Sequence, residues 1–223
     1  MRTVQTFAWT LALGATLATG CSSMNKTQKG VGIGAAGGAV VGGVIGRAAG
    51  NTAMGAIIGA AVGGTAGGVI GRRMDKQAEE MKQVMGDAEV RREGEGIIIN
   101  FKEKVLFGFN EAALGASAKA NLDKLVNVLN KYPDTNIEVI GHTDDKGTDA
   151  YNQQLSERRA QATTSYIQSK GIAANRLKAK GMGESDPVVD NSSDDNRSQN
   201  RRVEFVITAN QKMVEDAKRE AGR

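Results

Sequence analysis

Eleven glycines recur at every fourth residue between positions 30 and 71, and this period most constrains what the chain can fold into. They form two runs, 30–50 and 55–71, separated by a short break. A spacing of four places them along one face of a helix, where two backbones can approach closely. Each interior glycine costs about 0.5–1 kcal/mol relative to alanine, so together they cost on the order of 5–10 kcal/mol. Close helix–helix packing in or on a membrane would offset that cost, and the pattern predicts a glycine zipper over residues 30–71.

Two further features favour a helical hairpin over a plain linker in this segment. Residues 34–47 and 59–72 match at ten of fourteen positions and share the sequence GGVIGR. Residues 48–71 carry no charge and as a helix would extend about 36 Å, which is enough to span a bilayer. Packing between zipper helices of different molecules would make a second copy of the chain a possible partner. The alternative is a flexible Gly/Ala linker, although such a linker would not keep a strict period.

The N-terminus has the organisation of a secretory signal that ends at a single cysteine. One positive charge precedes an apolar stretch at 7–18, which is too short to span a membrane. Small residues then precede Cys21, a pattern that resembles the bacterial lipobox, although Ala18 stands where that family usually has leucine. The resemblance implies a signal peptide over 1–20, acylation of Cys21, a lipidated tether over 21–29 and, because serine follows the cysteine, an outer-membrane location. The alternative is an ordinary cleaved signal that leaves a free thiol.

The formal net charge of +4 comes from the N-terminal third of the chain. Residues 1–71 hold four basic side chains and no acidic one, whereas 72–223 hold 25 of each. A nucleic-acid-binding domain would concentrate positive charge on its folded part, so we expect no nucleic-acid partner. A single cysteine and a single histidine exclude an internal disulfide and a zinc cluster, and no metal or cofactor is expected.

After the zipper, residues 72–96 are charged and amphipathic instead of glycine-rich. Met74, Ala78, Met81 and Met85 recur on one helical face, with lysine and glutamate on the other. This predicts an amphipathic helix used for core packing or for a short coiled coil. The charged, glycine-bounded stretch that follows it is expected to be a linker.

Residues 97–209 are predicted to form an α+β domain of βαβαββ order. The mixed sheet would be covered on one face by helices, since helices follow the first two strands. Strands are expected from the β-branched and aromatic content, and helices from apolar periodicity and their stop signals. The expected strands are 97–109, 136–143, 176–180 and 202–208. One helix is expected between Ser117 and Pro133, and a second from the end of a polar loop at 144–150 to about Lys170. Residues 210–223 are expected to be a polar C-terminal tail.

Four motifs in this region carry a resemblance to a known family. They are IEVIGHTDDKG, YNQQLSERRAQATTSYI, KGMGESDP and NRRVEF. In this order and spacing they resemble the OmpA-like peptidoglycan-binding domain, which is shared with Pal and MotB-type proteins. The resemblance covers nearly all of residues 97–208. It implies non-covalent binding of the peptidoglycan stem peptide at the free end of its diaminopimelate residue.

The resemblance also implies which residues hold that ligand. The family's gripping aspartate corresponds to Asp144 of HTDDKG, and its gripping arginine corresponds to Arg159 of LSERRA. Relatives often have aspartate at the position of Asn110, so the role of this residue is open. The flanking pocket residues that the family pattern suggests are Phe107, Asn110, Asn152 and Leu155, with Arg201 and Arg202 near the rim.

The two gripping residues also suit the ligand on chemical grounds alone. A diaminopimelate side chain ends in an ammonium and a carboxylate on one carbon. An aspartate accepts hydrogen bonds from the first, and the planar fork of an arginine donates to the second. The alternative is that Asp144 and Arg159 pair with each other in a surface bridge worth about 0–1 kcal/mol. His142 lies beside this site but is expected to stabilise a turn, because it has no histidine or cysteine partner.

These expectations lead to one principal hypothesis and two alternatives. In the first, the chain is an outer-membrane lipoprotein that tethers the membrane to the cell wall, and it is not an enzyme. In the second, the zipper is the active part, an oligomeric membrane-inserting element for which the wall domain is an anchor. A wall-cleaving enzyme is the third, but Asp144 and Asp145 are neighbours in one loop, not an opposed catalytic pair.

Overall fold

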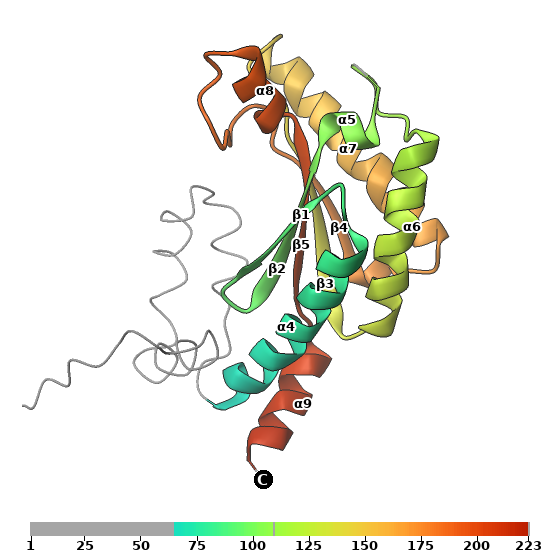
Figure 1. Cartoon of the computed structure of the whole chain (residues 1–223), viewed down its shortest axis with the longest axis vertical. Coiled ribbons are helices and arrows are strands. Elements are labelled where there is room, and N and C mark those ends of the chain that lie inside the picture. The colour runs from blue at the N-terminus through green and yellow to red at the C-terminus, as the bar shows by residue number, and fades with distance from the viewer. Residues whose placement is uncertain (1–64, 109, 223) are drawn as a thin grey trace, which may run out of the picture.

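The computed structural model of the chain describes residues 65–108 and 110–222. The signal-like segment, Cys21 and most of the glycine zipper therefore lie outside the described residues. The described part forms a five-stranded mixed sheet with helices packed against one face (Figure 1). The strands are β1 (Glu89–Glu93), β2 (Gly96–Lys102), β3 (Thr135–Gly141), β4 (Leu177–Gly181) and β5 (Arg202–Ala209). The helices are α4 (Thr65–Val84), α5 (Glu103–Leu106), α6 (Ala116–Lys131), α7 (Asp149–Ser169), the 3-10 turn η1 (Ala174–Arg176), α8 (Asp194–Asn200) and α9 (Gln211–Ala221).

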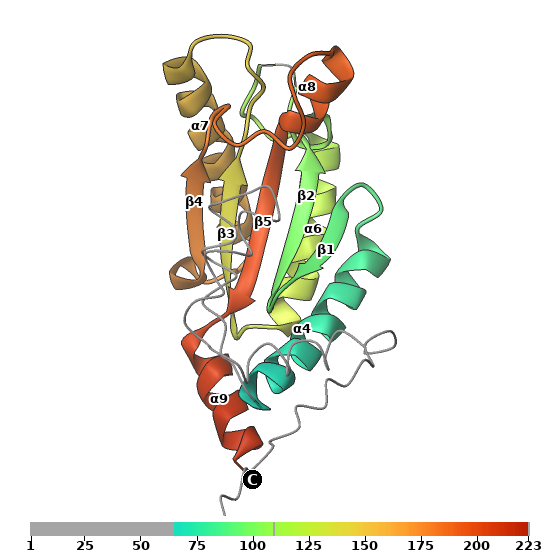
Figure 2. The ribbon, with the colours of Figure 1, turned by 90° about the vertical axis from the view of Figure 1, so that its left-hand side faces the viewer.

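The strands lie side by side in the order β1-β2-β5-β3-β4, as the face-on view shows (Figure 2). Every neighbouring pair is antiparallel except β3 and β4, which are parallel. The parallel pair is joined by α7, as a crossover between parallel strands requires. The predicted α+β class, with a mixed sheet and helices on one face, is confirmed.

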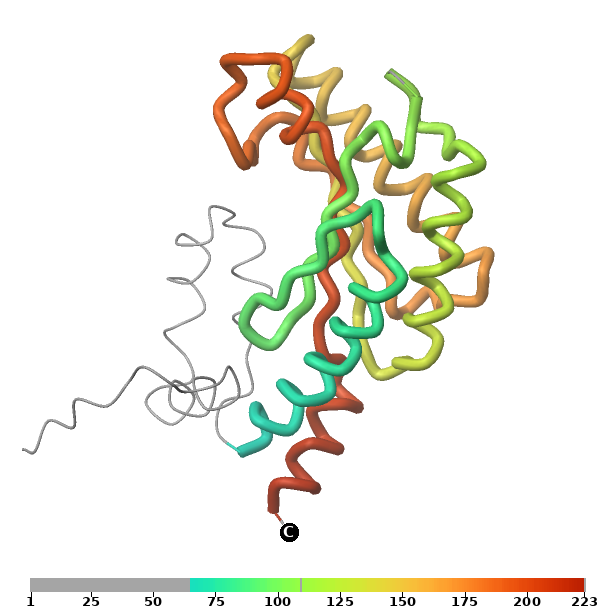
Figure 3. Tube along the Cα trace, in the orientation of Figure 1, coloured from blue at the N-terminus to red at the C-terminus, as the bar shows by residue number. Residues whose placement is uncertain are grey.

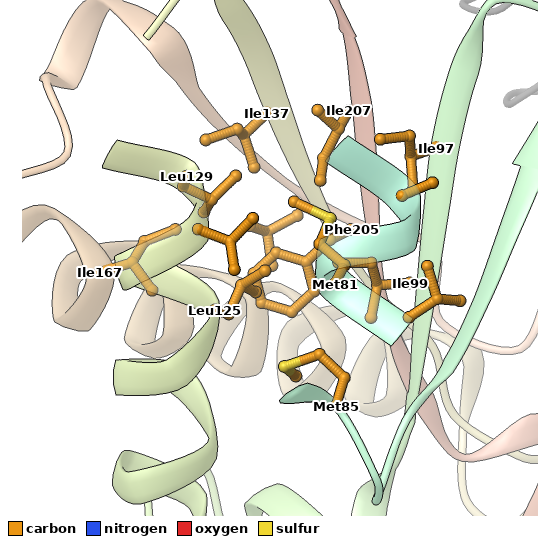
Figure 4. Close-up of a cluster of buried hydrophobic side chains, with 14 of the residues drawn as sticks. Met81, Met85, Ile97, Ile99, Leu125, Leu129, Ile137, Ile167, Phe205 and Ile207 are labelled. Atoms are coloured by element: carbon orange, nitrogen blue, oxygen red, sulfur yellow. The ribbon is translucent and has the colours of Figure 1, made fainter. Parts of the chain in front are cut away.

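Successive side chains along each strand point to opposite faces of the sheet. Ile97, Ile99, Phe101, Phe205 and Ile207 point toward the helices, where they meet Leu125 and Leu129 of α6 and Ile167 of α7 (Figure 4). A smaller apolar group lies on the opposite face and consists of Ile98, Ile140 and Val206. The main core thus lies between one sheet face and the helical layer.

Helix α4 belongs to the main core, as its methionine pattern predicts. Met74, Ala78 and Met81 are fully buried, and Met81 and Met85 reach the centre of the core beside Phe205 (Figure 4). Helices α4 and α9 lie side by side at the end of the sheet away from α8 (Figures 2 and 3). Within the described part of the chain, no helix is both long and apolar enough to cross a membrane.

Three elements differ from the expectations. The expected linker over 86–96 contains strand β1, which pairs with β2 through a tight turn in which Gly94 has a φ of 54°. Strand β2 ends at Lys102 instead of continuing to 109, because α5 begins there. The expected polar tail is helix α9, whose N-terminus is capped by Asn210 and which buries Met213 and Ala217.

One glycine permits α7 to lie close against the sheet. A Cβ at Gly141, the last residue of β3, would come within 2.2 Å of the Ser156 carbonyl oxygen on α7. Any larger residue would push the helix away from the strand end. This close approach holds the N-terminal half of α7 beside the loop that leaves β3.

Candidate functional site

The two predicted gripping residues lie at the same end of the molecule. Asp144 follows β3 by three residues, and Arg159 lies in the third turn of α7. The same end carries α5, α8 and the start of α7, which gather around the strand ends (Figure 1). Segments far apart in the sequence therefore meet where the resemblance places the ligand.

Two further charged residues link Asp144 to Arg159 in a continuous network. Nη2 of Arg159 donates to Oε1 of Glu103, and Nε of Arg201 forms an ion pair with Oε2 of Glu103 at 2.7 Å. Nη1 of Arg201 in turn donates to Oδ2 of Asp144 at 2.6 Å. The order along the network is Arg159, Glu103, Arg201, Asp144, so two guanidinium groups alternate with two carboxylates.

The strand pairing explains why these residues meet. Lys102 of β2 pairs with Arg202 of β5, and the next backbone bond runs from the Glu103 N–H to the Arg201 carbonyl at 2.9 Å. On the other side of β5, the His142 N–H donates to the Arg202 carbonyl at 2.9 Å. The first residues beyond three neighbouring strand ends are thus adjacent, and α7 adds Arg159 above them.

The network is largely shielded from solvent. Arg159 is 2% exposed and Asp144 is 7% exposed, whereas the Arg201 side chain is 30% exposed. Burial lowers the pKa of Arg159, and the Glu103 carboxylate opposes that shift by favouring the charged guanidinium. Nε of Arg159 donates to the Glu111 carbonyl at 2.9 Å, and the guanidinium carbon lies 5.4 Å from the centre of the Phe107 ring. Arg159 is therefore a buried, fixed cation rather than a surface one.

The flanking residues that the resemblance suggests surround this network. Asn152, Leu155 and Arg159 recur on one face of α7. The Asn152 amide donates to the Asp144 carbonyl at 3.2 Å and to Glu184. Asn110 has a left-handed backbone, with a φ of 59°, and accepts from the Tyr151 hydroxyl of α7. These contacts bring the segment after α5 and the start of α7 together at the site.

Comparisons with known proteins find similarity over the segment that holds this network. Residues 106–201 match the OmpA family, and residues 1–75 match the YMGG-like Gly-zipper. We call the folded part of the chain that carries this match the OmpA-family domain, after that similarity. Outer membrane protein A of Escherichia fergusonii is 44% identical over 117 residues, which are 48% of each chain. The chain spans between 16% and 48% of the length of the curated relatives it matches first.

Two solved structures share the fold of the OmpA-family domain. A putative MotB-like protein from Desulfovibrio vulgaris is 29% identical, with a TM-score of 0.59 over 63% of this chain and 93% of that one. The cell wall anchor of the T6SS from Pseudomonas aeruginosa is 26% identical, with a TM-score of 0.54 over 61% of this chain and 97% of that one. Both structural alignments cover almost the whole of the other chain, so the similarity extends over its entire fold.

Some site expectations for the OmpA-family domain need correction. Arg202 does not lie at the rim but is fully buried on the opposite sheet face, where its Nε donates to Glu204 at 2.8 Å. Asp144 and Arg159 do not pair with each other, since each has a different partner. Glu103 was not expected at the site, because residues 97–109 were expected to form one strand. An acidic residue within that strand was the signal that could have revealed it.

A shallow hollow lies to one side of the network. It measures about 300 Å³ and is lined by α7 and by the turn after β4, with Asp149, Gln153 and Glu184 among its residues. Neither Asp144 nor Arg159 lines it. Each of these two residues already has an internal partner, Arg201 for Asp144 and Glu103 for Arg159.

Proposed function

We propose that the OmpA-family domain binds peptidoglycan non-covalently, at the diaminopimelate end of the stem peptide. The observation that carries the proposal is the network itself, in which buried carboxylates and guanidinium groups alternate at one end of the sheet. This arrangement offers an acceptor for an ammonium and a donor fork for a carboxylate a short distance apart. The likeness to a structure described as a cell wall anchor supports the same ligand class.

In this proposal each residue has one role. Asp144 accepts from the ligand ammonium, and Arg159 donates to its carboxylate. Phe107 supports the guanidinium from one side, and Asn152 holds the Asp144 loop through the backbone carbonyl. Leu155 of α7 and Asn110 of the segment after α5 flank the ligand. No metal is required, and among residues 65–108 and 110–222 no cluster of histidine, cysteine and acidic side chains could hold one.

The test compares two stem peptides, one with diaminopimelate and one with lysine, which lacks the terminal carboxylate. We expect calorimetry on the full chain in detergent to show clear preference for the diaminopimelate peptide. Loss of one partner of a paired, partly desolvated charge costs about 2–5 kcal/mol, so Asp144→Asn should weaken binding by about thirtyfold or more. Arg159→Lys should not restore the preference, because a point charge cannot replace a bidentate fork.

Three outcomes would contradict this assignment. Equal affinity for the two peptides would mean that Arg159 does not hold a carboxylate. Wild-type affinity in a folded Asp144→Asn variant would remove the proposed ammonium acceptor. Cleavage of the peptide during the titration would indicate an enzyme instead of a binding domain. Thermal melts of each variant are needed because Arg159 is buried.

We further propose that the chain is an outer-membrane lipoprotein that tethers the membrane to the wall with its folded domain in the periplasm. The support is the position of Cys21 at the end of a signal-like segment and the identity with outer membrane proteins. Several acyl chains on one cysteine would anchor the chain stably, since each buried CH₂ contributes about 0.8 kcal/mol. Intact-mass analysis of membrane-extracted protein should give residues 21–223 plus acyl chains. An unmodified mass would exclude the lipid anchor.

A second candidate function concerns the zipper, because residues 1–75 match a Gly-zipper family. In this alternative the zipper helices associate in the membrane and the wall domain only anchors them. Replacing Gly38, Gly42, Gly59 and Gly63 with leucine should then block close approach of the backbones and abolish crosslinked oligomers in detergent. Unchanged crosslinking would identify the segment as a passive linker.

A further inference from the structure

We infer that the free edge of β4 is a second binding site, which takes an extended polypeptide segment with acidic side chains as an added strand. The site is separate from the ionic network, and the inference does not depend on the proposed wall ligand. Strand β4 is the last strand of the sheet, and no described segment pairs with its outer side (Figure 2). Its central residues, Lys178, Ala179 and Lys180, are exposed.

The backbone of β4 presents hydrogen-bonding groups along this edge. The Met182 N–H, directly after β4, donates to the Gly141 carbonyl of β3 at 2.9 Å. Backbone groups alternate in direction along a strand, so Ala179 and Gly181 direct theirs away from β3. Accordingly, the Gly181 carbonyl accepts from Nε2 of Gln153 on α7 at 3.0 Å instead of from β3. Both backbone groups of Ala179 and the N–H of Gly181 are therefore directed toward an added strand.

A hollow between α7 and β4 provides room for a side chain of that strand. Ala179 is level with Val139, which belongs to the main core, so Ala179 points toward the helical face. Helix α7 packs tightly at Gly181, where a Cβ would come within 2.5 Å of Oγ of Ser156. Beside Ala179 there is a hollow of about 390 Å³, which Arg158 also lines. Side chains level with one another on neighbouring strands share a face, so the added strand would direct a side chain into this hollow.

The charges at this edge favour an acidic segment. Arg158 lines the hollow, while Lys178 and Lys180 lie on the opposite sheet face. None of the three forms a salt bridge with any residue that the structure describes. Lys178 is level with Glu138 of β3, and the nearby Glu157 accepts from a neighbouring glutamine at 2.7 Å. Acidic side chains on either face of an added strand would thus meet a cation that has no close anionic partner.

The same lysines disfavour a second copy of the chain as the occupant. Pairing β4 with β4 of another copy would bring Lys178 and Lys180 opposite like charges, which is how edge lysines prevent self-association. At the other edge of the sheet the charges are balanced internally, since Arg91 of β1 lies within 4 Å of Glu89 and Glu93. An acidic segment would combine main-chain hydrogen bonds with favourable charge pairs at β4.

Ala179→Pro tests the main-chain contacts. Proline removes the outward N–H, and an edge strand tolerates it where that N–H faces solvent. The matched control, Ala179→Ser, keeps the N–H and a small side chain. The probes are two acetylated hexapeptides, (Glu-Val)₃ and (Lys-Val)₃, added to the full chain in a non-ionic detergent. We expect (Glu-Val)₃ to shift the Gly181 amide NMR resonance and to bind Ala179→Pro at least tenfold more weakly than Ala179→Ser.

A double variant, Arg158→Gln with Lys180→Gln, tests the charges. It should reduce the preference for (Glu-Val)₃ over (Lys-Val)₃ by about fivefold, because exposed charge pairs contribute modestly. Lys119→Gln with Lys124→Gln, two exposed lysines on α6, is the control and should keep the wild-type preference. Equal binding of the two peptides by the wild type would overturn the acidic specificity. Equal binding of (Glu-Val)₃ by Ala179→Pro and Ala179→Ser would overturn the strand addition.

Hydrogen exchange of the wild type covers the case in which Ala179→Pro does not fold. The Ala179 amide should exchange more slowly when (Glu-Val)₃ is added, and an unchanged rate at millimolar peptide would overturn the inference. Slower exchange at higher protein concentration without peptide would identify a second copy as the occupant and likewise overturn it. The diaminopimelate stem peptide should not displace (Glu-Val)₃. Displacement would make this edge part of the wall-binding site and would contradict a separate site.

Discussion

At the scale of single residues, the least expected feature is a buried ionic cluster on the sheet face opposite the main core. Glu204 of β5 accepts from Nε of Arg202 at 2.8 Å and lies 3.5 Å from Nε2 of His142. Arg202 also donates to the carbonyls of Asn200 and Asp186, which fixes the loop that precedes β5. His142 was expected to stabilise a turn, and its carboxylate partner could not be foreseen because strand pairing, not sequence distance, brings the two together.

The cluster makes stability depend on pH in the acid range. Burial alone would raise the pKa of Glu204, but the neighbouring His142 and the charge of Arg202 lower it to about 2, from 4.5. A depressed carboxyl pKa contributes stability above pH 4.5, and this contribution is lost as the pH falls from 4.5 toward 2. The shift corresponds to about 3 kcal/mol at most. Burial also lowers the pKa of His142, so its protonation opposes folding below pH 6.5.

We predict that Glu204→Gln lowers the free energy of unfolding most at pH 7. The difference in this free energy between wild type and variant should become smaller between pH 4.5 and pH 2. The reason is that the wild type loses its charged Glu204 over that range while the variant has none to lose. Urea unfolding at pH 7, 4.5 and 3 measures the difference. Glu89→Gln on the exposed edge of β1 serves as the control and should give a constant, small difference. A pH-independent deficit for Glu204→Gln would show that Glu204 is not the titrating group.

At the scale of elements, the sequence predicted what depends on local pattern. Helices α6 and α7 lie within two residues of their expected bounds, because apolar periodicity, Pro133 and Gly171 define them. Strand β1 was missed since EVRRE lacks the β-branched pattern and pairs only because β2 presents an edge to it. Helix α9 was missed because its apolar face has only a few members, and α4 supplies the surface that buries them. Tertiary contacts, not propensity, decide both elements.

The close contact between β3 and α7 leaves no room for a side chain at Gly141. We predict that Gly141→Ala destabilises the domain by several kcal/mol, since the new Cβ would meet the Ser156 carbonyl oxygen at 2.2 Å. Overpacking of this kind costs about 1–3 kcal/mol, and more where backbone must move. Gly86→Ala is the matched control, because a Cβ there meets nothing within 4 Å. Thermal unfolding of the two variants should separate them clearly, and equal melting temperatures would mean that α7 is not held so closely.

At the scale of the whole molecule, the glycine zipper and the folded domain share one helix. The zipper pattern extends to Gly71, and α4 runs from Thr65 through that point to Val84. The end of the zipper segment is therefore joined without a break to a helix of the domain core. The linker expected over 86–96 therefore does not separate this segment from the folded domain, because residues 65–84 already belong to its core.

This coupling predicts that the OmpA-family motif region cannot fold without α4. A fragment of residues 87–223 holds every motif of the family but lacks Ile70, Met74 and Met81, each completely buried in the main core. Burial of one such side chain contributes about 1.5–3 kcal/mol, and a domain of this kind has about 5–15 kcal/mol of net stability. We expect the 87–223 fragment to show no cooperative thermal transition by circular dichroism, whereas residues 65–223 should unfold in a single step. Met81→Ala in the longer fragment should lower its stability by about 2–5 kcal/mol. Cooperative unfolding of the shorter fragment at the same temperature as the longer one would show instead that α4 lies against the domain without stabilising it.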